Sequence, residues 1–226
     1  MAKVNEQLLG RISGKLGNLV YRKIGDTTFV STRPEKYNYS TSEKAVKARK
    51  GFSNLVAFAV FVNSIPILNK IWSLREVKGK RAYNKIISHN KSNFNSDSVN
   101  KNFRIVPKNN SNIISFFKSS FISDPSSILT FSIQIDPDFL SNSNVDLTCF
   151  IVLVIYNKES DKFMSQVNEL ILSENKNEFD FSISIDHNII KKIDGINNFV
   201  IFSSIVLLAN NYTIAGWTDS YSIISH

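Results

Sequence analysis

Residues 10–36 read Gly-Arg-Ile-Ser-Gly-Lys-Leu-Gly-Asn-Leu-Val-Tyr-Arg-Lys-Ile-Gly-Asp-Thr-Thr-Phe-Val-Ser-Thr-Arg-Pro-Glu-Lys. Two strand-like runs, Leu19–Ile24 and Thr27–Arg33, flank Gly25-Asp26, a two-residue connection with glycine first, as a type II′ turn requires. Pro34 then ends the ladder, because proline has no N–H to donate. The stretch predicts a β-hairpin that must pack on other structure, since an isolated hairpin is marginally stable in water.

A long helix is predicted after the hairpin. Ser40-Thr-Ser-Glu43 has the form of a capping box with Ser40 as the N-cap residue. Apolar residues then recur at helical spacing as far as Ile65, where Pro66 should kink or end the helix. Shorter helices are predicted over Ile67–Trp72 and Glu76–His89.

The second half of the long helix is apolar on nearly every side. A module with one hairpin and two short helices offers too little surface to cover such a helix. The outward strand faces of the rest of the chain read as polar, so we expect a second copy to cover it. The residues expected to mediate self-association are Phe52, Leu55, Phe58, Phe61 and Val62.

The periodicity changes after residues 90–102, which are rich in Asn and Ser and predict a linker. Seven strand-like runs follow, at about Asn112–Phe121, Ser127–Ile135, Leu147–Tyr156, Phe163–Leu172, Phe179–Asp186, Asn198–Ala209 and Tyr212–Ile223. Their spacing is typical of an immunoglobulin-like or fibronectin-like β-sandwich. The prediction is an α+β chain: a basic hairpin-plus-helix module over residues 1–89, a linker over 90–104 and a seven-stranded sandwich over 105–226.

Net charge divides the chain at the same place. Residues 1–104 hold 20 Lys and Arg against 6 Asp and Glu, a net charge of +14, and residues 105–226 hold 7 against 13, a net charge of −6. Three interpretations fit this asymmetry: a nucleic acid or other polyanion as partner, a solvated basic face, or head-to-tail contact between the basic half of one copy and the acidic half of another.

The basic residues fall into two clusters. Lys44, Lys47 and Lys50 or Arg49 are about three residues apart and share one face of the predicted helix. The second cluster accompanies the hairpin, interleaved with aromatic residues. Such a surface neutralises phosphates without reading bases, or binds an acidic protein surface. The residues assigned to binding a polyanion or partner are Arg11, Lys15, Arg22, Lys23, Arg33, Lys44, Lys47, Arg49 and Lys50.

The sequence has no catalytic or metal-binding pattern. Residues 10–17 invite comparison with a phosphate-binding loop, but Lys15 is followed by leucine and no strand precedes it. His89, His187 and His226 are scattered, and neither Cys-x-x-Cys nor Gly-x-Ser-x-Gly occurs. The single cysteine, Cys149, lies in an apolar strand and is interpreted as a buried small hydrophobe. We therefore expect a protein that is not an enzyme and uses no cofactor or metal.

No segment predicts export or a membrane span. The N-terminus lacks the apolar core of a signal peptide, and no apolar run reaches about 18 residues. The default expectation is a cytoplasmic protein, with export by another route left open.

A signature extends over the N-terminal region. It comprises the run from Leu9 to Val20 with its motif Gly14-Lys-x-Gly-Asn, then Arg33-Pro34, then a helix rich in Ala, Lys and Phe. Further on, an apolar strand ends in Val-Ile-Tyr-Asn157, and Ser220-Tyr221 follows a later strand. This pattern resembles a bacterial family of uncharacterised proteins. Because that family has no established activity, the resemblance implies an architecture with a C-terminal β domain and no catalytic residues.

These observations predict a non-enzymatic structural or assembly protein that binds copies of itself or a larger complex. A head-to-tail contact would propagate into a ring or a filament. The alternative is a nucleic-acid-associated protein whose basic N-terminal module binds phosphates.

Overall fold

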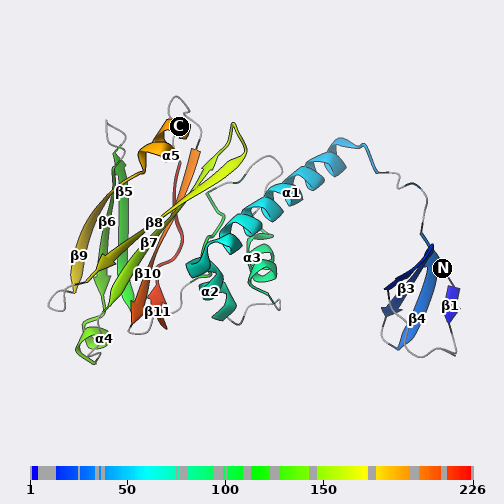
Figure 1. The fold of residues 1–226 in the computed structure, drawn as a ribbon, viewed down its shortest axis with the longest axis horizontal. Coiled ribbons are helices and arrows are strands. Elements are labelled where there is room, and N and C mark those ends of the chain that lie inside the picture. Colours follow the sequence, from blue (N-terminus) through cyan, green and yellow to red (C-terminus); the bar gives the residue numbers. More distant parts are fainter. Residues whose placement is uncertain are drawn as a thin grey trace. The chain divides into compact units, whose positions relative to one another are not determined.

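The computed structural model describes residues 2–4, 14–24, 26–33, 36, 39–74, 76, 81–93, 99, 101–108, 113–122, 128–142, 147–172, 177–193, 199–209 and 213–224. The chain folds as two compact units, Met1–Glu43 (unit 1) and Lys44–His226 (unit 2). Helices and antiparallel sheets are both present, so the predicted mixture of α and β structure is confirmed (Figure 1).

Unit 1 is an antiparallel sheet of four short strands in the order β1-β4-β3-β2. The strands are β1 (Ala2–Val4), β2 (Gly14–Leu16), β3 (Leu19–Ile24) and β4 (Thr27–Thr32). The predicted hairpin is confirmed as β3 and β4, with Arg22 opposite Phe29. Gly17, in the turn between β2 and β3, has a φ of 58°, a left-handed conformation that glycine adopts at little cost. Gly25, the first residue of the predicted type II′ turn, lies outside the described residues.

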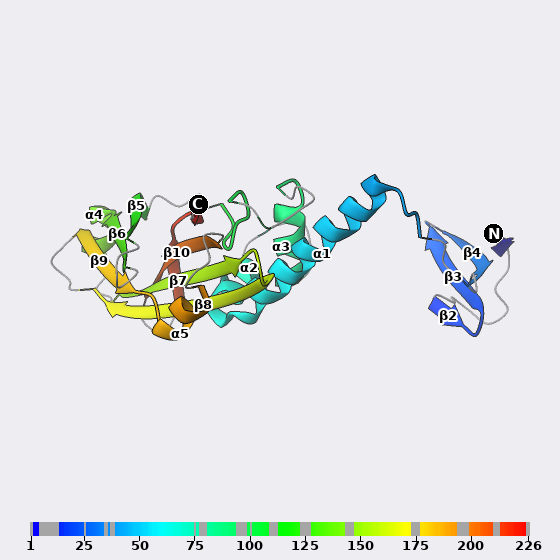
Figure 2. The same cartoon turned by 90° about the horizontal axis from the view of Figure 1, so that it is seen from above.

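Unit 2 has three layers (Figures 1 and 2). Its central layer is a five-stranded antiparallel sheet in the order β11-β10-β7-β8, with β12 also paired to β10. Three helices cover one face of this sheet, and a three-stranded sheet in the order β5-β6-β9, called here the outer sheet, covers the other.

The elements of unit 2 have the following bounds. The helical layer comprises α1 (Glu43–Ser64), α2 (Pro66–Leu74) and α3 (Ala82–Asn90). The central sheet comprises β7 (Thr148–Asn157), β8 (Lys162–Ile171), β10 (Phe199–Ala209), β11 (Thr213–Trp217) and β12 (Tyr221–Ile224). The outer sheet comprises β5 (Ile114–Ile122), β6 (Ile128–Ile135) and β9 (Glu178–Ser184), and two short helices, α4 (Pro137–Asn142) and α5 (His187–Ile193), complete the unit.

The central sheet is apolar on both faces, which is why it lies in the middle. Val152 and Val154 of β7 belong to the core shared with the helices, and Ile151 and Leu153 belong to the core shared with the outer sheet. A strand buried on both faces reads as a continuous apolar run instead of an alternating one. β7 and β10 have that composition, so they need a covering layer on each side.

The observed division of the chain therefore differs from the predicted one. The prediction grouped the helices with the hairpin in residues 1–89, whereas the units divide after Glu43 and the helices share a core with the central sheet. The assumption that outward strand faces are polar holds for Asp180 and Ser182 of β9, both exposed, but fails for the helix-side face of β7.

Residues 101–107, here called the strap, overlap the predicted linker and are fixed within unit 2. Phe103 and Ile105 are buried. Trp72 of α2 donates its Nε1–H to the carbonyl of Ile105 (2.8 Å), and Trp217 of β11 donates its Nε1–H to the carbonyl of Pro107 (3.0 Å). The strap thus joins the helical layer to the central sheet. The linker prediction, which ended at residue 104, is wrong over residues 101–104, because Phe103 is buried and the N–H of Arg104 bonds to a side chain instead of water.

Asn90, the first residue of the predicted linker, is the fully buried last residue of α3. Its Nδ2 donates to the carbonyls of Ile86 and Arg104, each at 3.1 Å, and its Oδ1 accepts the N–H of Arg104 at 2.7 Å. A polar residue that suggested a loop is therefore an internal support of the strap.

Two local predictions also differ from the structure. The seventh predicted strand is interrupted, since Thr218 is buried between β11 and β12 and accepts the N–H of Ile205 on its Oγ1 (2.9 Å). The described part of unit 2 accordingly has eight strands in place of seven. At the other end, α1 begins at Glu43, three residues after the predicted N-cap residue Ser40.

The break predicted at Pro66 is confirmed, since α1 and α2 meet there at an angle of 101°. Among the residues that the structure describes, no single helix is long and apolar enough to cross a membrane, and only this bent pair reaches that length and hydropathy in combination.

Candidate docking surfaces

One face of the sheet in unit 1 carries a cluster of apolar side chains. Leu16 lies opposite Leu19, and Tyr21 lies opposite Val30. Directly opposed residues of an antiparallel pair project to the same side of the sheet, so these four side chains define what we call the apolar face. Leu16 is 63% exposed and Leu19 is 37% exposed. Large apolar side chains are thus presented to solvent on a small sheet.

The other face of unit 1 carries cations, and we call it the cationic face. Lys15 lies opposite Val20, and Arg22 lies opposite Phe29. Lys23 belongs by register to the apolar side, and its Nζ lies 3.9 Å from Oδ1 of Asp26. The basic cluster predicted for the hairpin is therefore divided between two faces. Of its remaining members, Arg33 is exposed, and Arg11 lies outside the described residues.

Unit 1 has almost no interior among its described side chains. Thr28 is the one buried residue among those of unit 1 whose side chains the structure describes, at 4% exposure. Sheets gain independent stability from a buried apolar face or from packing against a helix. The described side chains of unit 1 thus supply little of that burial themselves.

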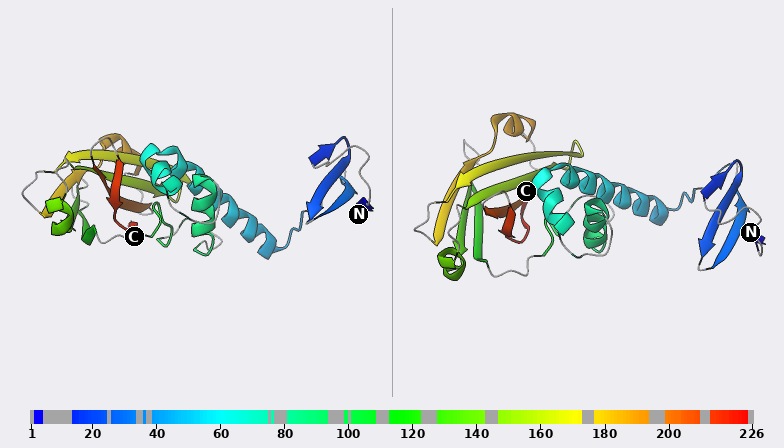
Figure 3. Two further views of the ribbon diagram at one scale, coloured as in Figure 1. Left: turned by 90° about the horizontal axis from the view of Figure 1, so that it is seen from below. Right: turned by 60° about the horizontal axis from the view of Figure 1, so that its bottom comes forward.

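The first turns of α1 carry the second predicted basic cluster. Lys44, Lys47, Arg49 and Lys50 are all exposed. Lys44 and Lys47 precede the buried residues Gly51 and Asn54 by seven residues, or two turns, so they lie on the same side of the helix as its packed face. This part of α1 projects beyond α3 (Figure 3). We call Lys44, Lys47, Arg49 and Lys50 the basic start of α1.

The apolar second half of α1 is not a free surface. Leu55, Phe58 and Val62 are fully buried within unit 2, with the Phe58 ring centroid 4.9 Å from that of Phe103 and 5.7 Å from that of Phe202. Three of the five residues predicted for self-association thus face the central sheet of their own chain.

The other two residues of that predicted set lie at or near the surface. Phe61 is partly buried and stacks on Phe163 of β8 at a centroid distance of 5.3 Å. Phe52 remains 54% exposed. The prediction failed at the buried positions because it overlooked the second apolar face of the sheet, which covers this side of α1.

The outward face of the outer sheet carries carboxylates along its β9 edge. Along β9, Glu178, Asp180 and Ser182 are exposed while Ile183 is buried. By register, Gln134, Ser132 and Thr130 of β6 lie beside them on the same face. Glu178 also accepts a hydrogen bond from Nε2 of Gln134 (3.2 Å). Glu178 and Asp180 are therefore neighbours along the β9 edge, and Ser132 separates Asp180 from Lys118 of β5 in the same row of the sheet.

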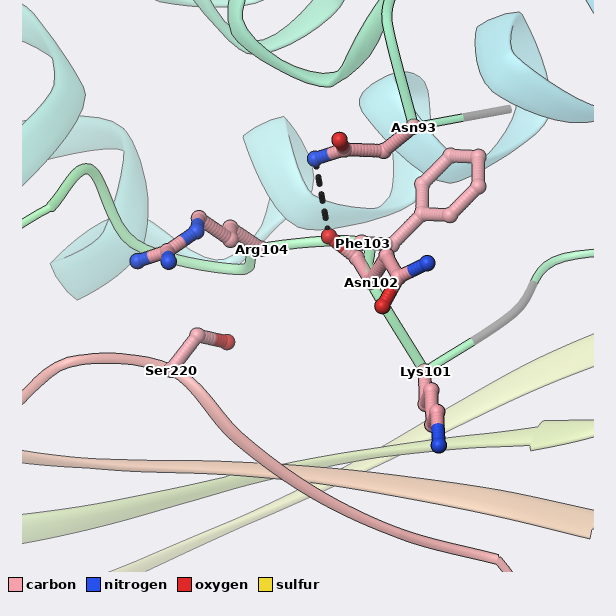
Figure 4. Close-up of a pocket in the computed structure, with 6 residues that line it drawn as sticks. All are labelled: Asn93, Lys101, Asn102, Phe103, Arg104 and Ser220. Carbon is pink, nitrogen blue, oxygen red and sulfur yellow. Dashed lines mark hydrogen bonds between the residues drawn. The ribbon is translucent and has the colours of Figure 1, made fainter.

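A polar hollow of about 280 Å³ lies where the strap meets β12 (Figure 4). Arg104 Nη1 lies 3.6 Å from Oδ2 of Asp219, and Asn93 Nδ2 donates to the carbonyl of Asn102 (2.9 Å). The side chains of Lys101 and Arg104 point in different directions (Figure 4). The two cations do not converge on a common ligand position, so the polar groups of the hollow serve chiefly to hold the strap.

Chemically reactive groups are few in the described part of the chain. The described residues contain no group of three or more His, Cys, Asp or Glu that could hold a metal ion. Cys149 is fully buried in β7, and burial raises the pKa of its thiol to about 12. Burial likewise raises the pKa of the Tyr156 hydroxyl, which donates a hydrogen bond to Asp161 Oδ1 (2.7 Å). Neither group is poised as a nucleophile or base near neutral pH.

A scan against protein-family models and a search of curated proteins found no match to this chain. The resemblance suggested by the Gly14-Lys-x-Gly-Asn motif accordingly stays a prediction.

Proposed function

We propose that this chain is a non-enzymatic assembly protein that associates with further copies of itself and uses unit 1 as its docking module. The observation that carries the proposal is the composition of unit 1: a sheet with exposed leucines on one face and one buried residue among its described side chains. A second surface laid on the apolar face would complete a core for unit 1 and form the contact in one step.

The two faces of unit 1 differ in what they can bury. Full burial of a leucine side chain contributes about 1.5–3 kcal/mol. Leu16 and Leu19 are still exposed, so a partner that covers them would gain part of this energy. The cationic face carries Lys15 and Arg22, whose burial is costly without acidic partners. The apolar face is therefore the surface suited to a protein partner.

We assign unit 2 the role of a platform of the immunoglobulin-like or fibronectin-like type. The strand order supports this assignment: β5, β6 and β9 form one sheet, and β7, β8, β10 and β11 form the other. If β11 and β12 count as one interrupted strand, this is the order of immunoglobulin domains that carry a C′ strand. The type of fold leaves the role open, because such sandwiches carry many functions.

The test of the docking module is a charge placed on each face of unit 1. Leu16→Asp should lower the solution mass measured by light scattering at concentrations where the wild type is multimeric. Ile24→Asp is the matched control, because Ile24 is 66% exposed and lies on the opposite face. A wild-type protein that stays monomeric over a hundredfold concentration range from about micromolar upward would contradict the proposal, as would equal effects of the two substitutions.

Nucleic-acid association is the second candidate, favoured by the exposed cations at the start of α1 and by the net charge of +14 over residues 1–104. Binding of that kind depends steeply on salt and little on base sequence. A fall in the solution mass of the purified protein after nuclease treatment would support it over self-association.

A further inference from the structure

The two outer layers of unit 2 carry opposite charges. Residues 44–104, which form the helical layer and most of the strap, hold 13 Lys and Arg against 2 Asp and Glu. Residues 113–142 and 177–193, which include the outer sheet with α4 and α5, hold 6 Asp and Glu against 3 Lys and Arg. Glu178, Asp180 and Asp138 are exposed. Because the helices and the outer sheet lie on opposite sides of the central sheet (Figures 2 and 3), unit 2 is electrically polar along the direction in which its layers stack.

We propose that the basic start of α1 in one copy docks on the carboxylates at the β9 edge of the outer sheet in the next copy. The inference rests on the proposed function, since it takes a second copy as the partner and adds the surface that receives it. The contact is heterologous: one copy contributes its helix and the other its sheet.

The helix side of this contact is suited to approach a flat surface. The residues of the basic start are exposed and precede the part of α1 that packs in unit 2. The positive end of the helix dipole lies in the same turns and adds to the potential of the side chains. A strongly positive projection of this kind steers towards an acidic surface over distances of about a Debye length.

The sheet side offers two exposed carboxylates at the β9 edge. On the neighbouring strand, Ser132 lies opposite Asp180 and Gln134 lies opposite Glu178, so neither partner in the ladder carries a charge. Glu178 and Asp180 are exposed, and ion pairs formed there need little desolvation. Such pairs favour orientation and association rate more than raw affinity. The apolar face of unit 1 would supply the larger share of the binding energy.

A second copy fits these two surfaces better than a nucleic acid does. The carboxylates at the β9 edge would repel phosphates and would have no role in a complex with them. A head-to-tail contact uses the basic layer of one copy and the acidic layer of the next. The two end copies then still offer one basic and one acidic surface, so the same contact repeats into a ring or a filament. Complementary charge on opposite sides of one unit is what such a repeat requires.

The experiment uses two neutralised variants of the full chain. The helix variant carries Lys44→Gln, Lys47→Gln and Lys50→Gln, and the sheet variant carries Glu178→Gln and Asp180→Asn. Each variant should associate with itself at least tenfold more weakly than the wild type at low salt. Mixed together, the two should bind each other as tightly as wild-type chains do, because the sheet variant keeps its helix and the helix variant keeps its sheet face.

Exposed residues elsewhere in unit 2 provide the controls. Lys91→Gln and Glu159→Gln remove one charge of each sign at exposed positions outside the two surfaces and should leave association unchanged. Wild-type association should weaken as salt rises from about 0.05 to 0.5 M, because screening shortens the range of charge interactions.

Failure of the inference is distinguishable from failure of the proposed function. If Leu16→Asp disrupts association but the charge variants have no effect or do not complement each other, the docking module stands and this inference is wrong. If the helix variant loses affinity for a 20-nucleotide single strand while its self-association is unchanged, a nucleic acid is the partner of these cations and the inference is again wrong. A monomeric wild type overturns both.

Discussion

The sheet of unit 1 and the central sheet of unit 2 are both antiparallel, yet they differ in how far their side chains are buried. β7 and β10 are buried on both faces, by helices on one side and by the outer sheet on the other. β3 is exposed or partly buried along its whole length. The contrast teaches that strand pairing alone does not determine whether a sheet is buried within its own chain. Strands with consecutive apolar residues are the ones that are covered on both faces.

The contrast has an energetic consequence. Burial of apolar side chains stabilises a fold by roughly 25 cal/mol per Å² of surface removed from water. The central sheet gains this stabilisation on both of its faces. The described side chains of unit 1 gain little of it. We therefore expect unit 2 to fold by itself and unit 1 to gain most of its stability from a partner.

The largest expected effect comes from a cavity in the core between the helices and the central sheet, and it tests whether unit 2 depends on that core. Phe58→Ala should lower the free energy of unfolding of unit 2 by about 3–5 kcal/mol, because Phe58 is fully buried against Phe103 and Phe202. Leu16→Ala, on the exposed apolar face, should leave unit 2 unchanged within about 0.5 kcal/mol. Denaturant unfolding followed by Trp72 and Trp217 fluorescence measures both, since the two tryptophans of the chain lie in unit 2.

The Phe58 experiment also separates the two interpretations of α1. If α1 packed between copies, Phe58→Ala would lower the solution mass of the protein and leave the unfolding free energy of the single chain unchanged. The structure predicts the reverse, with lost stability at every protein concentration. A loss below about 1 kcal/mol would show that the core of unit 2 does not depend on α1.

Much of the fold could be predicted because its signals are local. The pairing of β3 with β4 follows from a two-residue turn, the break at Pro66 from the missing N–H of proline, and β9 from the alternation of Phe179, Asp180 and Phe181. Each of these signals acts within a few residues. Local pattern and structure agree wherever the neighbours in sequence are also the neighbours in space.

The grouping of the layers could not be predicted, because it depends on which apolar faces meet. The sequence of α1 indicates a helix that needs cover on several sides, but the side chains that cover Phe58 come from Phe103 and Phe202, 45 and 144 residues away. The linker prediction failed for a related reason: Asn90 bonds to Arg104, its partner 14 residues further along the chain, and composition does not reveal that contact. The continuous apolar runs of β7 and β10 were the available signal of a sheet covered on both faces.

The candidate surfaces were predicted in part. The exposed cations of α1 follow from charge, and their exposure is confirmed by the structure. The apolar face of unit 1 was missed, although strand alternation places Leu19 and Tyr21 on one side and Arg22 on the other, and register then adds Leu16. Whether either surface binds a partner stays a prediction.

A medium effect should come from the strap. Asn90→Ala removes an amide that makes three hydrogen bonds in a fully buried position, and it leaves the N–H of Arg104 without that acceptor. We expect a loss of about 1–3 kcal/mol in the unfolding free energy of unit 2. Asn93→Ala is the matched control, because its amide is partly exposed and water can replace it. Equal, small losses for both variants would restore the interpretation of this segment as a linker.

The smallest effect concerns Cys149, which lies in the strand that most distinguishes the central sheet from unit 1. Cys149→Ala removes a buried sulfur atom, so we expect a loss of about 1 kcal/mol near neutral pH. The substitution should leave association unchanged, because the thiol lies in the core between the central and outer sheets. A polar thiol reagent should modify the wild-type protein only as fast as unit 2 opens, and rapid labelling would contradict the burial.

The pH dependence of stability provides a second readout for the same thiol. Burial raises the pKa of Cys149 from its ordinary 9.0 to about 12, so between these values the unfolded chain loses the thiol proton while the native chain keeps it. The stability linked to this thiol is therefore fully present below pH 9. It falls as the pH rises, and the free energy of unfolding is lower by about 1.4 kcal/mol at pH 10. Tyr156, whose pKa burial also raises, acts in the same direction in both proteins and cancels in the comparison. The wild type should then lose more stability than Cys149→Ala between pH 8 and pH 10, and parallel curves would show that the thiol is not held in the core.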